Sequence, residues 1–235
     1  MRKKSTLILA FVSFLTLNLS AQKDGEKDNR SYIKAGLNIA NITFSNDGHL
    51  ENTNNLFSFH AGIVKDLRIA PMLYLQPGVL FTSKGMKSSS GKSTDASYFT
   101  ASTNPNYIEV PMNILVKLPI NKSKLFFGAG PYGAVAVGGK NKAEGKILGV
   151  AFESEKKIKF GDYSEEDGTT IEDFTGIGKM QRFDYGINAT IGFEASHMFL
   201  SGNYGYGMQN IQSISNSETE VNKHRVISIS LGFRL

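Results

Sequence analysis

Hydrophobic and polar residues alternate with a period of two along most of the chain after residue 31. Between Ile108 and Leu118, for example, every second residue is aliphatic or Met. Successive side chains of a β-strand point to opposite faces, so this alternation predicts strands with one apolar and one polar face. It predicts eight strands, at Tyr32–Thr43, Leu56–Ile69, Met72–Met86, Asn106–Leu118, Lys124–Val137, Gln181–Ala195, His197–Gln209 and Asn222–Leu235.

The lengths of the connections between these segments alternate as well. In chain order they are 12, 2, 19, 5, 43, 1 and 12 residues. If neighbouring strands are antiparallel, all short turns lie at one end of the sheet and all long loops at the other. This is typical of outer-membrane barrels. The sequence therefore predicts an all-β fold, an eight-stranded antiparallel up-and-down transmembrane β-barrel.

Alternation alone does not distinguish a membrane barrel from a secreted, lipocalin-like barrel with an apolar interior. Three features favour the membrane. The polar face carries glycines and charges of both signs, which fit a narrow lumen. The apolar face has five or six residues in each segment, enough for a lipid band of roughly 25 Å. Aromatic residues gather near segment ends, as interfacial girdles require. Long apolar runs are absent after residue 20, which excludes a helical membrane protein.

The first 21 residues have the features of a secretory signal peptide. Arg2, Lys3 and Lys4 precede an apolar stretch from Leu7 to Leu17, and Ala21 offers a small residue for cleavage. Eleven residues are too few for a membrane-spanning helix. We expect residues 1–21 to be the signal, 22–30 a polar segment and 31–235 the barrel domain. Without the signal, the chain has 23 basic and 21 acidic residues. Its net charge of +2 indicates no nucleic-acid partner.

Charged residues on the polar faces are the candidate functional residues. We expect a network of polar side chains in the lumen, formed by Glu109, Lys117, Arg182, Asp184, Glu194 and Arg234. Salt bridges that fill the lumen are the favoured interpretation. A path for protons or small solutes is the alternative.

Other candidate chemistry is weak, and we predict no catalytic, cofactor or metal site. The chain has no Cys, which excludes thiolate chemistry. Asp47, His49 and His224 lie toward the long-loop end, but their spacing specifies neither a triad nor a metal site. The stretch 139–146 lacks the register and the Ser or Thr of a P-loop. The acidic stretch 162–173 lacks the oxygen spacing of an EF-hand, so a solvated loop is favoured.

Three short motifs resemble the Bacteroidota outer-membrane β-barrel family, the PorT-like proteins with an "outer membrane protein beta-barrel domain". They are Tyr107–Pro111 with Lys117, Gly128–Gly133, and Asp184–Gly186 leading to Gly192. The resemblance covers roughly residues 30–235 and implies a barrel in the outer membrane of a Gram-negative, Bacteroidota-like cell, in contact with its lipid. It implies little about molecular activity.

The longest loop, residues 138–180, is the candidate recognition site for a protein partner. Its inner part, 147–160, alternates weakly, so we expect the segments at Lys124–Val137 and Gln181–Ala195 to continue as a hairpin above the membrane, with an edge open to a partner strand. The leading hypothesis is a non-enzymatic structural or interaction protein with a plugged lumen. The alternatives are a narrow porin-like channel, a PorT-like accessory of type IX secretion and a soluble periplasmic binding barrel.

Overall fold

The computed structural model describes residues 29–46, 49–52, 54–91, 97–147, 149–161, 180–210 and 221–235. The predicted signal peptide, residues 22–28 and the acidic stretch 162–173 lie outside the described residues. Among the helices of the described part, none has the length and hydropathy needed to cross a lipid bilayer.

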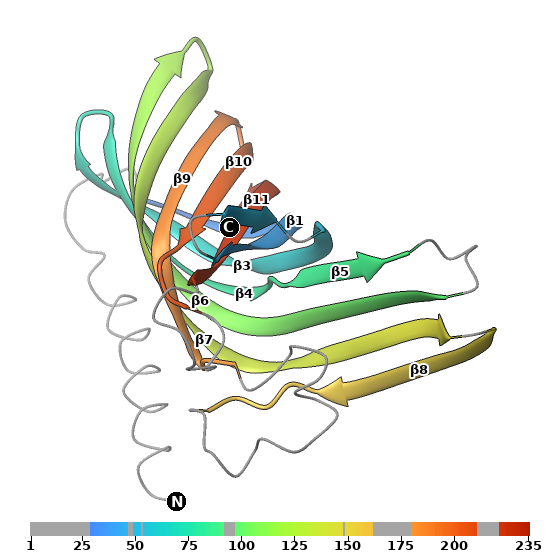
Figure 1. Ribbon diagram of the computed structural model, residues 1–235. Coiled ribbons are helices and arrows are strands. Elements are labelled where there is room, and N and C mark those ends of the chain that lie inside the picture. The colour runs from blue at the N-terminus through green and yellow to red at the C-terminus, as the bar shows by residue number, and fades with distance from the viewer. Residues whose placement is uncertain are drawn as a thin grey trace, which may run out of the picture.

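The described chain forms one antiparallel sheet of eleven strands (Figure 1). The strands are β1 (Arg30–Asn46), β2 (His49–Asn52), β3 (Leu56–Ala70), β4 (Leu73–Ser83), β5 (Met86–Ser90), β6 (Tyr98–Ile120), β7 (Ser123–Ile147), β8 (Val150–Lys157), β9 (Phe183–Ala195), β10 (Met198–Gly207) and β11 (Val221–Arg234).

Eight of these strands close into a barrel. β1 pairs with β3 on one side and with β11 on the other, so the first and last strands of the chain are neighbours. The ring runs β1, β3, β4, β6, β7, β9, β10 and β11, and every neighbouring pair is antiparallel. Closure pairs the backbone groups that an open sheet edge would leave exposed to lipid. The predicted eight-stranded up-and-down barrel is confirmed, with one barrel strand for each predicted segment.

The two faces of the barrel have inverted polarity relative to a soluble barrel. On β9, Phe183, Ile187 and Ile191 are exposed, whereas Asp184 and Glu194 are buried. The same division holds on β11, where Ile227, Ile229 and Leu231 point outward and Ser230 is fully buried. The apolar face of each strand therefore points outward, and the polar face lines the lumen.

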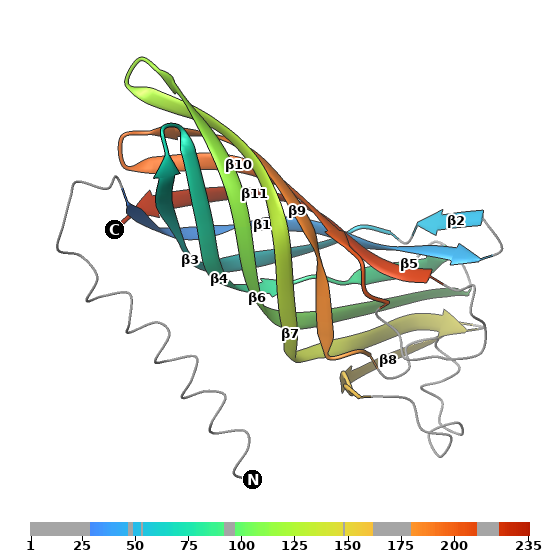
Figure 2. The ribbon, with the colours of Figure 1, turned by 90° about the vertical axis from the view of Figure 1, so that its left-hand side faces the viewer.

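Three short turns lie at the end of the barrel that also holds Arg30 and Leu235, which we call the short-turn end (Figure 2). Each turn contains one non-glycine residue at positive φ: Met72 between β3 and β4, Asn121 between β6 and β7, and Ser196 between β9 and β10. Tight hairpin turns require such a conformation. The opposite end, the long-loop end, carries β2, β5 and β8.

At the long-loop end, the sheet extends beyond the barrel. β5 pairs with the first part of β6, and β8 pairs with the last part of β7, so β5, β6, β7 and β8 lie side by side (Figure 1). We call these four paired segments the outer sheet. The prediction that the segments at Lys124–Val137 and Gln181–Ala195 continue together as a hairpin was wrong for the second segment. β7 does continue, to Ile147, but the chain then turns back into β8, and β9 begins only at Phe183. Residues 98–105, expected to be loop, belong to β6.

Aromatic side chains and glycines fill the lumen together. Tyr32, Tyr74, Phe126 and Phe199 belong to a buried cluster in the half near the short turns. The Phe199 ring lies over Gly232 of the neighbouring strand, where an added Cβ would stand 2.1 Å from its Cε1 atom. Glycine is thus the residue that leaves room for the ring on the inner wall.

Candidate functional site

The lumen holds charged side chains that are almost inaccessible to solvent. Near the short-turn end, the Lys117 ammonium of β6 donates to Asp66 of β3 and to Glu194 of β9, with Nζ 2.6 Å from Glu194 Oε2. The side chains of all three residues are at most 3% exposed. One cation thus joins two carboxylates from strands on either side of β6. We call Asp66, Lys117 and Glu194 the Lys117 cluster.

Further partners complete this cluster. Arg30 Nη1 lies 2.5 Å from Glu194 Oε1, and Gln76 Nε2 donates to Asp66 Oδ1 at 2.9 Å. The Lys117 ammonium also lies 5.2 Å from the ring centroid of Tyr74 and 5.3 Å from that of Phe126. A buried ion pair is tolerated when hydrogen bonds satisfy its remaining oxygens and protons, and these contacts supply them.

A second cluster of the same design lies toward the long-loop end. Lys84, which follows β4, places its Nζ 2.8 Å from Glu109 Oε2 and 2.8 Å from Asp184 Oδ2. The Tyr132 hydroxyl donates to Asp184 at 3.3 Å, and its ring centroid is 4.2 Å from the ammonium. Lys84, Glu109 and Asp184 form what we call the Lys84 cluster. On β6, Glu109 and Lys117 are eight residues apart on one face, or roughly 26 Å along the strand.

A small polar cavity of about 50 Å³ lies between the two clusters. Lys34, His60, Gln76 and Glu109 are among its lining residues. Lys34 donates to Asn203 at 3.3 Å, and His60 bonds to Asn38 and Ser230 at 2.7 and 2.9 Å. A cavity of this size has room for a few water molecules and is far smaller than a ligand pocket.

Apolar side chains cover the lumen at the long-loop end. Ile158 and Met180 are buried together, with Met86 and Phe160 packed against them. Phe160 also contacts the cluster of Tyr107 and Tyr132 inside the barrel. The backbone fixes this cover: Ile158 N donates to Gly139 O, and Met180 N donates to Lys159 O, each at 3.1 Å. We call Met86, Ile158, Phe160 and Met180 the apolar cap.

Of the six predicted lumen residues, four lie in the lumen and two do not. Glu109, Lys117, Asp184 and Glu194 are buried and belong to the two clusters. The expectation for Arg182 and Arg234 is wrong, because both side chains are exposed. Arg182 precedes β9, and its backbone carbonyl accepts a bond from Ala136. Arg234 is the last residue of β11, so its side chain reaches past the rim.

Sequence reasoning missed other members of the lumen network, chiefly Asp66, Lys84 and Arg30. Asp66 and Lys84 both lie on the polar face of their predicted segments, so the alternation already pointed them inward. Arg30 fell in the segment expected to be a polar tail, but β1 begins with it. Its pairing with Glu194 joins residues 164 positions apart, which no local pattern reveals.

Residues 21–213 match the family model described as "Outer membrane protein beta-barrel domain". The chain belongs to this family. Membership places the barrel in an outer membrane, consistent with an apolar outer face and a charged lumen. None of the curated proteins matches the sequence.

Several solved outer-membrane barrels are similar to this family member in fold. Ail, the attachment invasion locus protein of Yersinia pestis, is 13% identical with a TM-score of 0.39, over 88% of this chain and 99% of that chain. OprG from Pseudomonas aeruginosa is 9% identical with a TM-score of 0.42, over 90% and 98%. Neisserial surface protein A is 12% identical with a TM-score of 0.38, over 87% and 97%.

The outer sheet of this outer-membrane barrel carries charge of both signs on its surface. Lys140 pairs with Glu155 at 2.5 Å, and Lys142 lies 3.2 Å from Glu144 and 3.1 Å from Glu153. The hydrogen bond from Lys140 lowers the pKa of Glu155, and the hydrogen bonds to Glu153 and Glu144 raise the pKa of Lys142. All these pairs are solvent-exposed and join β7 to β8, or neighbours within β7.

Proposed function

We propose that this protein is a non-enzymatic structural or interaction protein of the outer membrane, with a closed lumen and an outer sheet presented to the cell exterior. The observation that carries the proposal is the pair of lysine clusters, in which Lys84 and Lys117 each join two carboxylates across the barrel. An eight-stranded barrel is just wide enough for side chains to fill. The two clusters and the apolar cap supply that filling.

The orientation follows from the ends of the barrel. Outer-membrane barrels keep short turns on the periplasmic side and longer loops outside. The short-turn end, with Arg30 and Leu235, is therefore periplasmic, and the outer sheet is extracellular. A signal peptide at residues 1–21 agrees with export to this compartment.

Conductance tests the closed lumen. The full barrel, reconstituted in a planar bilayer, is expected to show no discrete open steps at ordinary voltages. Insertion is established separately, by a band that shifts on boiling in SDS-PAGE. Regular conductance steps from a protein that shows this band shift would favour the narrow channel over the plugged lumen.

The candidate site for a protein partner is the segment 138–180, and within it the edge strand β8. All eight residues of β8 are exposed, and among the described strands it pairs only with β7. Such an edge offers unpaired backbone groups to a partner strand, while Glu153, Glu155, Lys156 and Lys157 limit unspecific pairing.

A site-specific photocrosslinker tests this partner site. Placed at Ser154 on β8, it is expected to capture a protein on intact cells, whereas the same group at the lipid-facing Phe183 captures none. Equal yields at both positions would remove β8 as the recognition edge.

The finer family assignment rests on the motifs Tyr107–Pro111, Gly128–Gly133 and Asp184–Gly186. They support a PorT-like barrel from a Bacteroidota-like cell. A role as an accessory of type IX secretion is tested by deleting the gene and measuring secreted cargo. Unchanged secretion would leave the structural role and remove the accessory role.

A further inference from the structure

The outer wall of the barrel carries a binding site that is separate from the lumen and the outer sheet. We propose that Lys223 and Arg225, with Arg225 held by Tyr206, bind the phosphate group of a phosphorylated glycolipid in the adjacent leaflet. We call these three residues the wall site. The choice of lipid rests on the proposed function, which makes the long-loop end extracellular, since the outer leaflet of an outer membrane is rich in phosphorylated glycolipid.

Arg225 and Lys223 lie on the outward face of β11. The residue between them, His224, is fully buried in the lumen, whereas Ile227 is 54% exposed. Successive side chains of a strand point to opposite faces, and β11 pairs with β1 in an unbroken register, so Lys223 and Arg225 share the face of Ile227. On β10, the exposed Tyr206 lies opposite Arg225. The wall site is therefore on the outside of the barrel and not on the lumen side of its rim.

Sheet register places Arg225 directly beyond the apolar band. Phe57 of β3, Ile39 of β1 and Ile227 of β11 lie opposite one another at one level of the wall. The next outward positions of β1 and β11 toward the long-loop end hold Asn41 and Arg225, which again lie opposite each other. Apolar side chains thus give way to amide and guanidinium groups at this level.

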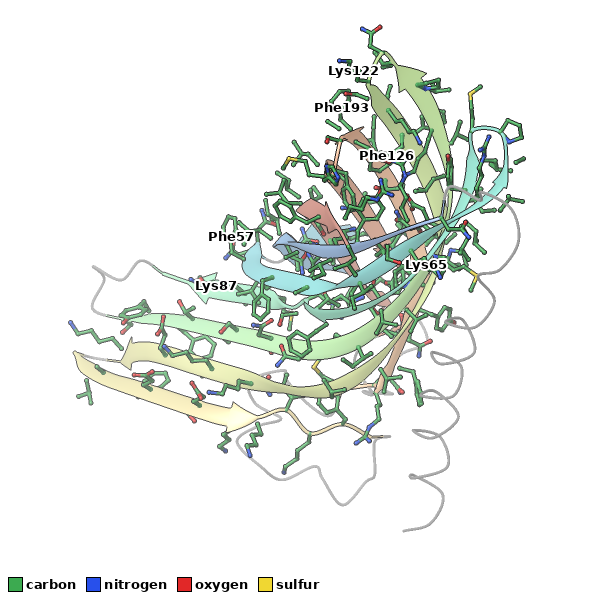
Figure 3. The ribbon with its side chains drawn as sticks, turned by 180° about the vertical axis from the view of Figure 1, so that it is seen from behind. Phe57, Lys65, Lys87, Lys122, Phe126 and Phe193 are labelled. Atoms are coloured by element: carbon green, nitrogen blue, oxygen red, sulfur yellow. The ribbon has the colours of Figure 1, made fainter. Side chains whose placement is uncertain are left out.

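The position of Phe57 shows which end of the barrel this level belongs to. In Figure 3, Phe57 lies at the end of β3 nearer to Lys87 of β5, with Lys65 toward the other end of the strand and Lys122 in the β6–β7 turn. Arg225 lies one level beyond Phe57, on the side of the long loops. Basic side chains at such a boundary lie among lipid headgroups while their stems contact the acyl region.

The Arg225 guanidinium is held by contacts that leave one of its edges available. Its Cζ atom lies 3.7 Å from the centroid of the Tyr206 ring. Its Nη1 donates to the backbone carbonyls of Gly207 and His224 at 3.0 and 2.8 Å. The N–H groups of Nε and Nη2 have no partner among the described residues. Nε and Nη2 form one edge of the planar group, and such an edge binds phosphate bidentately.

No described carboxylate neutralises the wall site. Lys223 and Arg225 form no ion pair with a described residue, unlike Lys142 of the outer sheet, which pairs with exposed glutamates. Asp184 lies on the other side of the wall, in the lumen, where it binds Lys84. Two cationic groups at headgroup level, neither paired with a described acid, match the charge of a phosphate group.

The neighbours of the wall site favour a glycolipid over other phosphate sources. Ile227 and Tyr204, one level closer to the middle of the membrane, are exposed and suit contact with acyl chains. A soluble phosphate compound would not use them. Beside Arg225, Asn41 Nδ2 donates to Asn55 Oδ1 at 3.4 Å, and Asn55 is exposed. Amide groups at this level can hydrogen-bond the sugar hydroxyls next to a phosphate, which a phospholipid offers in smaller number.

Binding of defined lipids to the full barrel in detergent tests the proposal. Native mass spectrometry measures binding of diphosphoryl lipid A and of the same lipid A without its phosphates, with phosphatidylglycerol and inorganic phosphate added as competitors. The site variant combines Lys223→Gln and Arg225→Gln. The matched control, Lys65→Gln with Lys122→Gln, removes two charges at the short-turn end. Tyr206→Leu keeps both charges and removes the ring that holds the guanidinium.

We expect diphosphoryl lipid A to bind the native barrel and the control equally, and the site variant about tenfold more weakly. Tyr206→Leu should weaken binding by a smaller factor. Lipid A without phosphates should not distinguish the variants. An equal loss in the control, or equal binding with and without the phosphates, would overturn the proposal. So would displacement of lipid A by an equimolar amount of phosphatidylglycerol or inorganic phosphate, because the sugar would then contribute nothing.

Folding and orientation are measured separately. Heat-modifiability on gels shows that each variant is folded. Detergent exposes both ends of the barrel, so the leaflet is tested on intact cells: Ser154→Cys, in a chain without other Cys, should react with a membrane-impermeant maleimide. Absence of this reaction would overturn the extracellular position of the outer sheet and the choice of glycolipid, whereas weaker lipid A binding in the site variant would still establish the phosphate contact. Conductance bears on neither result.

Discussion

Lys117 and Glu194 meet inside the barrel at 2.6 Å, although their strands, β6 and β9, are separated by β7 in the ring. Asp66 approaches the same ammonium from β3, which is separated from β6 by β4. The contact therefore spans the lumen and connects walls that share no backbone hydrogen bonds. Toward the other end, Lys84 joins Asp184 of β9 to Glu109 of β6, the strand next to β4.

Replacing Lys117 by Met should strongly destabilise the barrel. The substitution removes the one ammonium that serves both Asp66 and Glu194 and leaves two carboxylates in a nearly dry lumen. Loss of one partner of a buried ion pair costs about 3–5 kcal/mol. The free energy of unfolding, measured by urea titration of the barrel in lipid vesicles, should fall by that amount.

A compensated variant separates charge from packing. Lys117→Met combined with Asp66→Asn and Glu194→Gln removes all three charges with little change in volume. We expect it to recover most of the lost stability. If the triple variant is as unstable as the single one, the cluster does not act through charge pairing.

A separate prediction concerns the apolar outer face of the barrel. Ile229 is 62% exposed near the middle of β11, with Ile227 and Leu231 beside it on the same face. An Arg at position 229 should cost about 2–4 kcal/mol in a bilayer, because the charge would lie in the hydrocarbon. Position 223, toward the long-loop end of the same strand, already carries a lysine, so Lys223→Arg keeps the charge and should cost little. Equal costs at both positions would contradict the position of the lipid band.

The barrel and the direction of its faces were predictable because alternation is a local signal repeated in every strand. Glu109, Asp184 and Glu194 could be placed in the lumen for the same reason. Their pairing with Lys84 and Lys117 could not be predicted, since it depends on which strands face each other across the lumen. The alternation alone misplaces Arg234. Its position points inward, but β11 ends there, so the side chain is exposed.

The outer sheet was the least predictable part of the fold. Residues 98–105 and 140–157 contain many small and charged residues, and neither face of this sheet is continuously apolar. Their pairing follows from the barrel, which holds β6 and β7 adjacent in the wall and lets the ladder continue beyond it. Alternation reports the burial of apolar side chains, so it is weak in this sheet, where small or polar residues such as Ala101 and Thr103 occupy the buried positions.

Acidification should loosen the pairing of β8 with β7. The Lys140 hydrogen bond lowers the pKa of Glu155 below its ordinary value of 4.5. A carboxyl group whose pKa is lowered on folding stabilises the structure above its ordinary pKa, and this contribution disappears as pH falls through the lowered pKa. Hydrogen exchange of residues 150–157, corrected for intrinsic rates, should show less protection at pH 3 than at pH 6. In Glu155→Gln this difference should shrink; an unchanged difference would assign the effect to another group.

The contact between Phe199 and Gly232 gives a prediction about packing. A Cβ at position 232 would stand 2.1 Å from Phe199 Cε1 and 2.3 Å from its Cζ. The ring has little room to move, because its centroid lies 5.1 Å from that of Tyr32 and 5.8 Å from that of Phe126. Gly232→Ala should therefore destabilise the barrel by about 1–3 kcal/mol, the usual cost of overpacking.

A double-mutant cycle tests the origin of that cost. Phe199→Leu alone should be destabilising, since it removes a buried ring. Combined with Gly232→Ala it should cost less than the sum of the two single changes, because the smaller side chain leaves space for the new methyl group. Gly202→Ala is the matched control on the neighbouring strand: a Cβ there meets nothing within 4 Å, so its effect should be small. Additive costs in the cycle would show that Gly232 is required by the backbone of β11 and not by the ring that lies over it.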